Sequence, residues 1–109
     1  MPRNDGLPPG TLIMLILRVL LNQSLHGYAI AQRIHTLSNG HLSVEEGSLY
    51  PALQKLLLNG WVKAAWTTSE TGREVREYRI TASGKKQLES EKTEYRRIAD
   101  AIGSLLDNA

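Results

Sequence analysis

The chain has 109 residues, of which 41% are hydrophobic and 22% charged, as in a single globular domain with a modest core rather than a disordered chain. It has no cysteine, which excludes disulfides, thiolate metal sites and a cysteine nucleophile. The net charge of +2 is compatible with a nucleic-acid partner but does not require one.

Residues 1–10 hold three of the four prolines and are predicted to form a flexible N-terminal arm. Thr11 is the expected cap of a helix from Leu12 to about Asn22, which is apolar nearly all round, with Arg18 as its only charge. Burying such a helix in so small a domain favours a second subunit. Its apolar run is shorter than the ~20 residues that a membrane span needs, and the chain start lacks a signal-peptide pattern, so a soluble, cytoplasmic protein is expected.

A second helix is expected from about Gly27 to Leu37, because apolar residues recur along it at helical spacing. The Ser-Asn-Gly sequence at 38–40 predicts its end, since glycine and asparagine adopt the left-handed backbone of a helix terminus.

A third helix is expected after Ser43 and Glu46, which have the spacing of a capping box. Pro51 lies within this helix, where a proline removes one hydrogen bond and clashes one turn back. Either the regular helix begins near Ser48, which places the proline in its first turn, or Gly47 marks a kink. The first interpretation is preferred.

A pair of β-strands follows, because apolar and polar residues alternate over 62–67 and again over 77–81. Residues 68–75 form the polar tip of the predicted hairpin, with Gly72 as its turn residue. Trp66 and Tyr78 are candidates for an aromatic pair across the two strands.

The last predicted helix runs from Ala82 to about Leu106 and carries apolar residues at heptad spacing, interrupted by Glu91. A long helix with a narrow apolar seam usually finds a partner. The order of elements predicts a mainly α protein with a small β-hairpin. Residues 11–81 would form a winged helix-turn-helix DNA-binding domain, and residues 82–109 a C-terminal dimerisation helix.

Five motifs in this order resemble the PadR family of transcriptional regulators, and the resemblance extends over about residues 10–106. They are Gly10-Thr11-Leu12, Leu25-His26-Gly27-Tyr28-Ala29-Ile30, Gly47-Ser48-Leu49-Tyr50-Pro51-Ala52-Leu53, Gly60-Trp61-Val62 and Tyr78-Arg79-Ile80-Thr81-Ala82-Ser83-Gly84. The short C-terminal part is similar to the subgroup with a single dimerisation helix. The resemblance implies a homodimeric regulator without enzymatic activity or cofactor, commonly a repressor that leaves a double-stranded operator when a small molecule binds.

The DNA contacts implied for the recognition helix lie at its exposed start and one turn on: Ser48, Tyr50, Pro51 and Lys55. Tyr50 is the leading candidate; alternatively, it covers the core beneath the wing. Lys55 is equally well explained as part of a solvated helix face. Glu45 and Glu46 suit a helix N-terminus but repel phosphate.

Arg73 and Arg76 are the candidates for wing contacts to DNA. Glu74 and Glu77 interleave with them, whereas relatives tend to carry consecutive basic residues after the wing glycine. This weak wing and the acidic start of the recognition helix support an alternative function, a winged-helix module for protein–protein contact without specific DNA reading.

The candidate dimerisation residues combine the first helix with the heptad seam of the last: Leu12, Leu15, Leu88, Tyr95, Ile98, Ile102 and Leu105. A pocket for a small aromatic or drug-like effector, lined by Met14, Arg18 and Tyr95, would form where the first helix faces the partner's last helix. The alternative is a fully packed interface. The target DNA of such a dimer would be an inverted repeat.

Metal binding and catalysis are not expected. His26, His35 and His41 lack the i, i+4 spacing and the acidic partners of a metal site, so no metal ligand is assigned. The chain has no Gly-x-Ser-x-Gly elbow and no phosphate-binding glycine loop, and no catalytic residue is assigned. His26, Gly27 and Tyr28 are interpreted as a structural unit at the start of the second helix. In this unit the glycine allows close packing, the histidine can cap the helix, and Tyr28 fills the core or reaches a phosphate.

Overall fold

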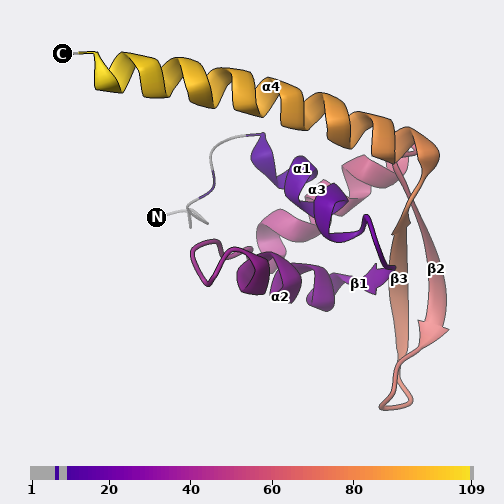
Figure 1. The fold of residues 1–109 in the computed structure, drawn as a ribbon. Helices are drawn as coiled ribbons and strands as arrows, with labels where there is room; N and C mark the ends of the chain where they lie inside the picture. Colours follow the sequence, from indigo (N-terminus) through magenta and orange to yellow (C-terminus); the bar gives the residue numbers. More distant parts are fainter. Residues whose placement is uncertain (1–6, 8–9, 109) are drawn as a thin grey trace.

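The computed structural model describes residue 7 and residues 10–108, so most of the predicted N-terminal arm lies outside the described residues. Four helices and a three-stranded antiparallel sheet follow in the order α1 (Thr11–Val19), β1 (Leu25–His26), α2 (Gly27–Leu37), α3 (Glu46–Leu58), β2 (Val62–Thr68), β3 (Glu74–Ile80) and α4 (Ala82–Asp107) (Figure 1). The predicted winged helix with a long C-terminal helix is confirmed.

Helix α1 is the centre of the fold and contacts each of the other three helices. It begins at Thr11, with Gly10 in a left-handed conformation before it, so Thr11 is the first helical residue rather than the cap. It ends at Val19, three residues earlier than expected, and the following Leu20 turns into the core with 1% of its surface exposed. Most of the apolar surface of α1 is therefore buried by its own chain. The sequence had favoured a second subunit for this role.

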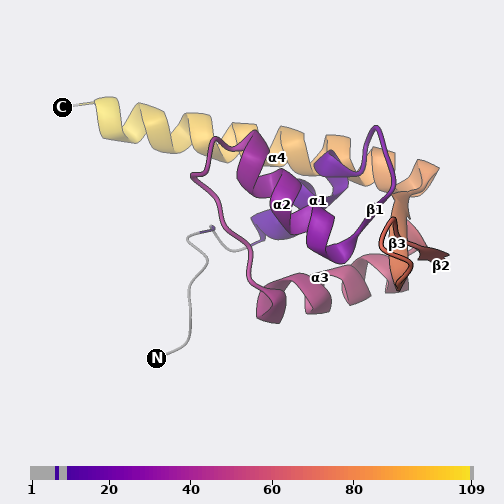
Figure 2. The ribbon, with the colours of Figure 1, turned by 90° about the horizontal axis from the view of Figure 1, so that it is seen from below.

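The hydrophobic core joins one face of each helix to the base of the sheet. Its fully buried side chains are Ile16, Leu17, Leu20, Ile30, Leu49, Leu53, Leu56, Val62 and Leu88. Seen from below, α3 lies on the side of the molecule away from α4 (Figure 2). This packing leaves the outer face of α3 exposed.

Helix α2 has the predicted bounds, and Asn39 and Gly40 after it have the positive φ values expected of its end. Helix α3 begins at Glu46, two residues before the preferred position, and Pro51 lies inside it. The proline nitrogen carries no hydrogen, so the carbonyl of Gly47, four residues earlier, has no helical partner. Gly47 is exposed to solvent.

The predicted capping box does not form, because Glu45 is the residue before the helix and not Ser43. The Ser43 hydroxyl instead lies 3.5 Å from Nδ1 of His35, on the preceding helix. The loop between α2 and α3 is thus held back to α2, and the cap position moves two residues along the chain.

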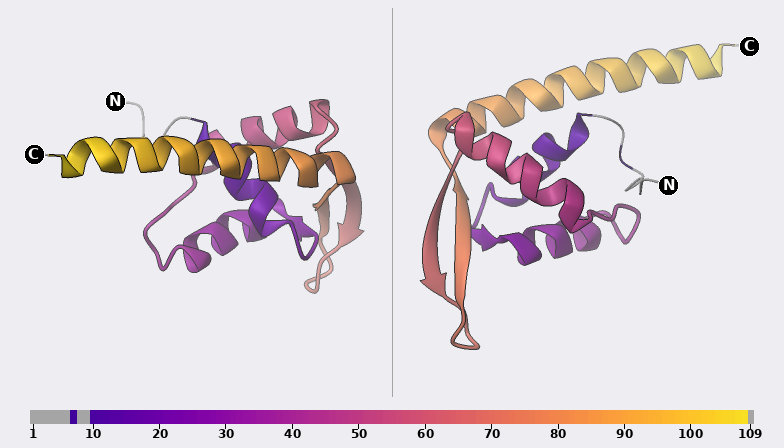
Figure 3. Two further views of the ribbon diagram at one scale, coloured as in Figure 1. Left: turned by 45° about the horizontal axis from the view of Figure 1, so that its top comes forward. Right: turned by 180° about the vertical axis from the view of Figure 1, so that it is seen from behind.

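The sheet has the order β1-β3-β2, so β3 is its central strand. The hairpin and its turn at Gly72, which has φ 82°, are confirmed. Trp66 pairs with Arg76, and Tyr78 with Ala64, so Trp66 and Tyr78 are diagonal neighbours across the two strands and are not directly opposite each other. The hairpin extends beyond the helices on the side away from α4 (Figure 3).

Helix α4 follows β3 after a single residue, Thr81. The Thr81 hydroxyl lies 2.7 Å from the carbonyl of Gly60 and accepts a hydrogen bond from the amide of Gly84 at 3.0 Å. Gly84 is buried against the carbonyl of Trp61 so closely that a Cβ would collide with it. The start of α4 is therefore locked to the end of α3 and the start of β2.

Within the part of the chain that the structure describes, no helix combines the length and the apolar character needed to cross a membrane.

Candidate nucleic-acid interface

The outer face of α3 carries the predicted recognition residues. Leu49, Leu53 and Leu56 turn inward, and the opposite face is open to solvent. The candidates on or beside that open face are Ser48, which is half-buried, and Tyr50, Pro51 and Lys55, which are exposed. Tyr50 has 47% of its surface exposed, which favours a contact role over the alternative that it covers the core beneath the wing.

Tyr50 lies against the first residue of α2. A Cβ built on Gly27 would be 2.9 Å from the Tyr50 hydroxyl oxygen and 3.1 Å from Cε1 of the ring. Only a residue without a side chain lets the tyrosine ring approach this closely. The prediction that Gly27 permits close packing thus has a specific counterpart, the recognition-helix tyrosine.

The wing presents both predicted arginines to solvent. Its tip is closed by hydrogen bonds between Ser69 and Arg73: the Ser69 amide donates to the Arg73 carbonyl at 2.8 Å, and the Arg73 amide donates to the Ser69 hydroxyl at 3.2 Å. The backbone at the tip is therefore ordered while the guanidinium remains exposed.

Arg76 shares one face of β3 with Tyr78, and its guanidinium carbon lies 6.0 Å from the centre of the Tyr78 ring. Because side chains alternate along a strand, Glu77 points to the opposite face, and only Glu74 shares the face of Arg76. Glu70, Glu74 and Glu77 nevertheless line the same groove as Arg73 and Arg76, so the acidic residues dilute the positive charge of the wing as the sequence indicates.

A groove of about 1130 Å³ lies between the wing and the starts of α2 and α3. Its lining includes Tyr50, Arg73 and Arg76, so it brings the predicted residues of the recognition helix and of the wing together. Ser48, Pro51 and Lys55 of α3 lie outside this lining.

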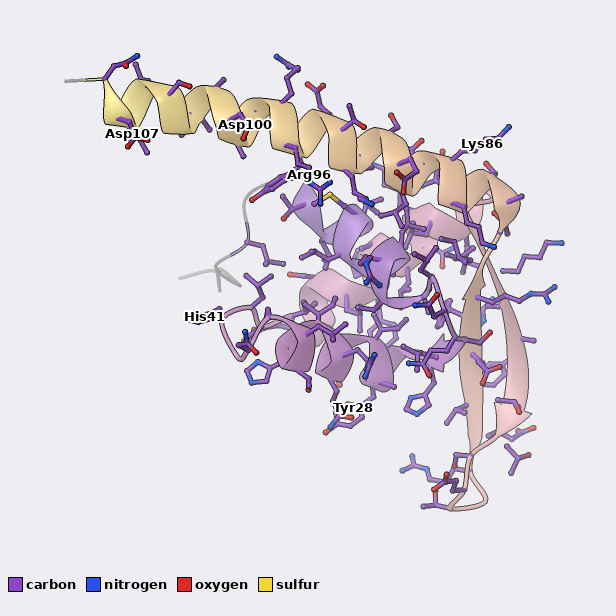
Figure 4. All side chains as sticks on the ribbon, viewed as in Figure 1. Tyr28, His41, Lys86, Arg96, Asp100 and Asp107 are labelled. Carbon is purple, nitrogen blue, oxygen red and sulfur yellow. The ribbon has the colours of Figure 1, made fainter. Side chains whose placement is uncertain are left out.

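Two exposed aromatic residues at this groove were not among the assigned contacts, although a phosphate contact was one alternative for Tyr28. Tyr28 is 64% exposed and Trp66 is 69% exposed, and both line the groove. Tyr28 extends from α2 toward the side on which the hairpin projects (Figure 4). The helical period could have predicted the exposure of Tyr28, because Gly27 and Ile30 turn inward and leave Tyr28 on the outer face of α2.

The predicted dimerisation residues fall into two groups. Leu88 is fully buried in the core of its own chain, and Leu12 and Leu15 are half-buried against that core. The residues left exposed lie along the second half of α4: Tyr95, Ile98, Ile102 and Leu105, with Leu106 beside them. Leu88 is therefore a core residue, and the prediction that it faces a partner is not supported by its burial.

The predicted effector pocket corresponds in part to a groove of about 520 Å³ between α1 and the second half of α4. Met14 and Tyr95 both line this groove, together with Ile98 and Ile102. Met14 thus lines a groove with these residues within one chain, and the contact across a dimer stays a prediction. Arg18 is exposed and lies outside the lining.

Among the described residues, no group of three or more histidine, cysteine, aspartate or glutamate side chains could hold a metal ion. His26 is the residue before α2, but its side chain makes no capping hydrogen bond, contrary to the capping role considered for it. Beside its aromatic rings, the wing groove carries two arginines, Arg73 and Arg76, and three glutamates, Glu70, Glu74 and Glu77. Its arginines can contact phosphates and its rings can contact sugars and bases, but its net charge does not by itself favour a polyanion.

Three helices with a β-hairpin wing and an exposed third helix define a winged helix-turn-helix protein, a class that binds DNA. The PadR-like family of transcriptional regulators matches residues 16–90 of the chain. The chain belongs to this family and is a DNA-binding transcriptional regulator, not an enzyme.

Solved structures support this assignment. A transcriptional regulator from Clostridium thermocellum is 27% identical, with a TM-score of 0.79 over 87% of this chain and 92% of that one. A PadR family regulator from Eggerthella lenta is 27% identical, with a TM-score of 0.76 over 92% and 85% of the two chains. PadR of Bacillus subtilis, solved in complex with operator DNA, is 30% identical, with a TM-score of 0.65 over 73% of this chain and 46% of that longer one.

Proposed function

We propose that the protein is a homodimeric repressor that binds an inverted-repeat operator and releases it when a small aromatic or drug-like molecule binds. The observation that carries the proposal is the division of its surface. One side presents the groove between the wing and α3, which is suited to DNA, and another presents an apolar face on the second half of α4, which is suited to a second copy.

Specific DNA binding is supported by the open face of α3 and by the exposed arginines of the wing. Tyr50 would contact sugar or a thymine methyl while its hydroxyl donates to phosphate, and Arg73 and Arg76 would contact the backbone. A dimer that makes about six phosphate contacts should show a slope of log affinity against log salt near −5.

The test of specificity is a titration against DNA from the region upstream of the protein's own gene, beside a scrambled DNA of equal length, at several salt concentrations. Binding about a thousandfold tighter than to the scrambled DNA, with that salt dependence, supports the proposal. If this DNA fails, selection from random sequences supplies the operator. A selection that yields no preferred sequence overturns specific reading and favours the protein-interaction module.

Dimerisation is supported by Ile98 and Ile102, which are exposed side by side on α4 at 44% and 52%. Changing both to lysine should produce folded monomers in analytical ultracentrifugation and abolish operator binding, because one recognition helix reads only one half-site. The two half-sites should lie about 34 Å apart, one turn of DNA. A double variant that remains dimeric contradicts the assignment of this face.

Release by an effector is supported by the groove between α1 and α4, whose volume is that of a small-molecule site and whose lining includes Tyr95. Met14→Trp should fill this groove. We expect the variant to bind the operator but to respond less to a ligand that releases the wild type. Repression itself is tested by a reporter gene behind the operator, whose expression should rise when the regulator is deleted.

A further inference from the structure

Tyr78 occupies the point where the wing meets the recognition helix. It lies on the central strand, opposite Leu25 of β1 and Ala64 of β2, and only 5% of its surface is exposed. A tyrosine in such a position has its ring fixed by packing on both sides. Any group that contacts this ring therefore has a rigid support.

Arg76 is supported in this way. It is exposed, yet its guanidinium lies over the Tyr78 ring at the outer limit of a cation–π contact. A free arginine loses much side-chain entropy when it binds a phosphate, and an arginine already held over a ring loses less. The ring thus prepares the wing arginine for its proposed contact.

Tyr50 reaches the same point from α3. Its hydroxyl lies over Gly27, and Tyr50, Tyr78 and Arg76 line one groove. Burial raises the pKa of the Tyr78 hydroxyl; Arg76 opposes that rise and Tyr50 adds to it. The raised pKa keeps the Tyr78 hydroxyl neutral at physiological pH.

We propose that Tyr78 is a positioning residue that holds the wing arginine Arg76 on the groove beside the recognition helix. Its ring supports Arg76, and Tyr50 lines the same groove through its close approach to Gly27. This inference rests on the proposed function, because the DNA contacts of Arg76 and Tyr50 are part of that proposal.

The first test addresses the ring. Operator affinity is measured against salt for the full-length wild type, Arg76→Ala, Tyr78→Leu and the double variant. Arg76→Ala should reduce the salt slope by about one, since one phosphate contact is lost. Tyr78→Leu should do the same, and the double variant should be no worse than either. Salt slopes that stay at the wild-type value in Tyr78→Leu, or effects that multiply in the double variant, overturn this role of Tyr78.

The second test separates the ring from the hydroxyl. Tyr78→Phe keeps the ring and removes the hydroxyl, so the salt slope should stay at the wild-type value if the ring holds Arg76. A slope that falls by about one in Tyr78→Phe assigns the effect to the hydroxyl and overturns the role of the ring.

A matched control separates positioning from stability. Trp61→Phe changes an aromatic residue packed against the same core but outside the groove. It should lower the melting temperature without changing the salt slope or its response to Arg76→Ala. A wild type that does not discriminate any operator overturns the proposed function. A wild type that discriminates, with a salt slope unaffected by Tyr78→Leu, overturns the role of Tyr78 alone.

Discussion

The two halves of α4 share one heptad pattern but have opposite surroundings. Leu88 in the first half is fully buried by its own chain, whereas Ile102, two heptads later, is 52% exposed. Figure 1 shows why: the first half of α4 lies over the helical body, and the C-terminal end of α4 runs on past it. Heptad spacing identifies an apolar face, but the length of the neighbouring helices decides what covers it. The first half belongs to the core, and the second half is available to a partner.

The two glycines of α4 give the largest expected contrast between these halves. Gly84→Ala should place a methyl group against the carbonyl of Trp61 and 2.8 Å from Cγ1 of Ile80, and we expect a loss of about 3 kcal/mol or more in the free energy of unfolding. Gly103→Ala meets nothing within 4 Å and should increase it by up to about 1 kcal/mol, because alanine favours helix. Urea denaturation of both variants measures the difference. Equal effects would contradict the locked start of α4.

Leucine and isoleucine truncations compare the two halves at equivalent heptad positions. Leu88→Ala should cost about 2–5 kcal/mol at every protein concentration, because it opens a cavity in the protomer core. Ile102→Ala should cost the dilute protomer less than about 0.5 kcal/mol. It should also weaken the rise of melting temperature with concentration that a dimer shows. Thermal melts over a hundredfold concentration range separate the two, and a strong concentration dependence for Leu88→Ala would reverse the comparison.

Thr81→Ala removes the hydroxyl that caps the first half of α4 and bonds to the end of α3. The expected loss is about 1–2 kcal/mol, the usual range for an N-cap with additional bonds. Thr81→Ser keeps the hydroxyl and is the matched control. If serine is as destabilising as alanine, the methyl group and not the hydrogen bonds carries the effect.

The smallest effect is expected at the exposed Glu94–Arg97 ion pair of α4. The hydrogen bonds from Arg97, at 2.6 and 3.2 Å, lower the pKa of Glu94. A lowered pKa in the folded state contributes stability above the usual glutamate pKa, and this contribution is lost as the pH falls through the lowered value. An NMR titration should find that the Glu94 pKa rises toward 4.5 in Arg97→Ala and in high salt. An unchanged pKa would contradict the pair.

Local patterns predicted the elements whose causes are local. The bounds of α2 follow from its apolar stripe and from the left-handed residues after it, and both signals lie within the element. The start of α3 was misplaced because Ser43 has a competing partner, His35, eight residues earlier in the chain. Strand β1 was missed because a two-residue strand has no periodicity, and it exists only through its pairing with β3.

The candidate site shows the same division. The open face of α3 followed from the buried leucines, so the exposure of Tyr50 could be predicted from spacing. The contact of Tyr50 with Gly27 and the shared position of Arg76 and Tyr78 depend on tertiary packing between residues far apart in the sequence. The within-chain meeting of Met14 and Tyr95 has the same origin, and the sequence pattern could not distinguish it from a contact between subunits.

The single residue between β3 and α4 has a mechanical consequence. Thr81 and Gly84 clamp this joint to the backbone of residues 60 and 61, so the central strand of the wing and the long helix move as one stiff arm. In a dimer held together by the far end of α4, the two arms would set the spacing between the wings. A small tilt where the helices cross would be magnified at the wing tips by the length of the arm. The pitch of the DNA that such a dimer can grip would then be determined at the opposite end of the molecule.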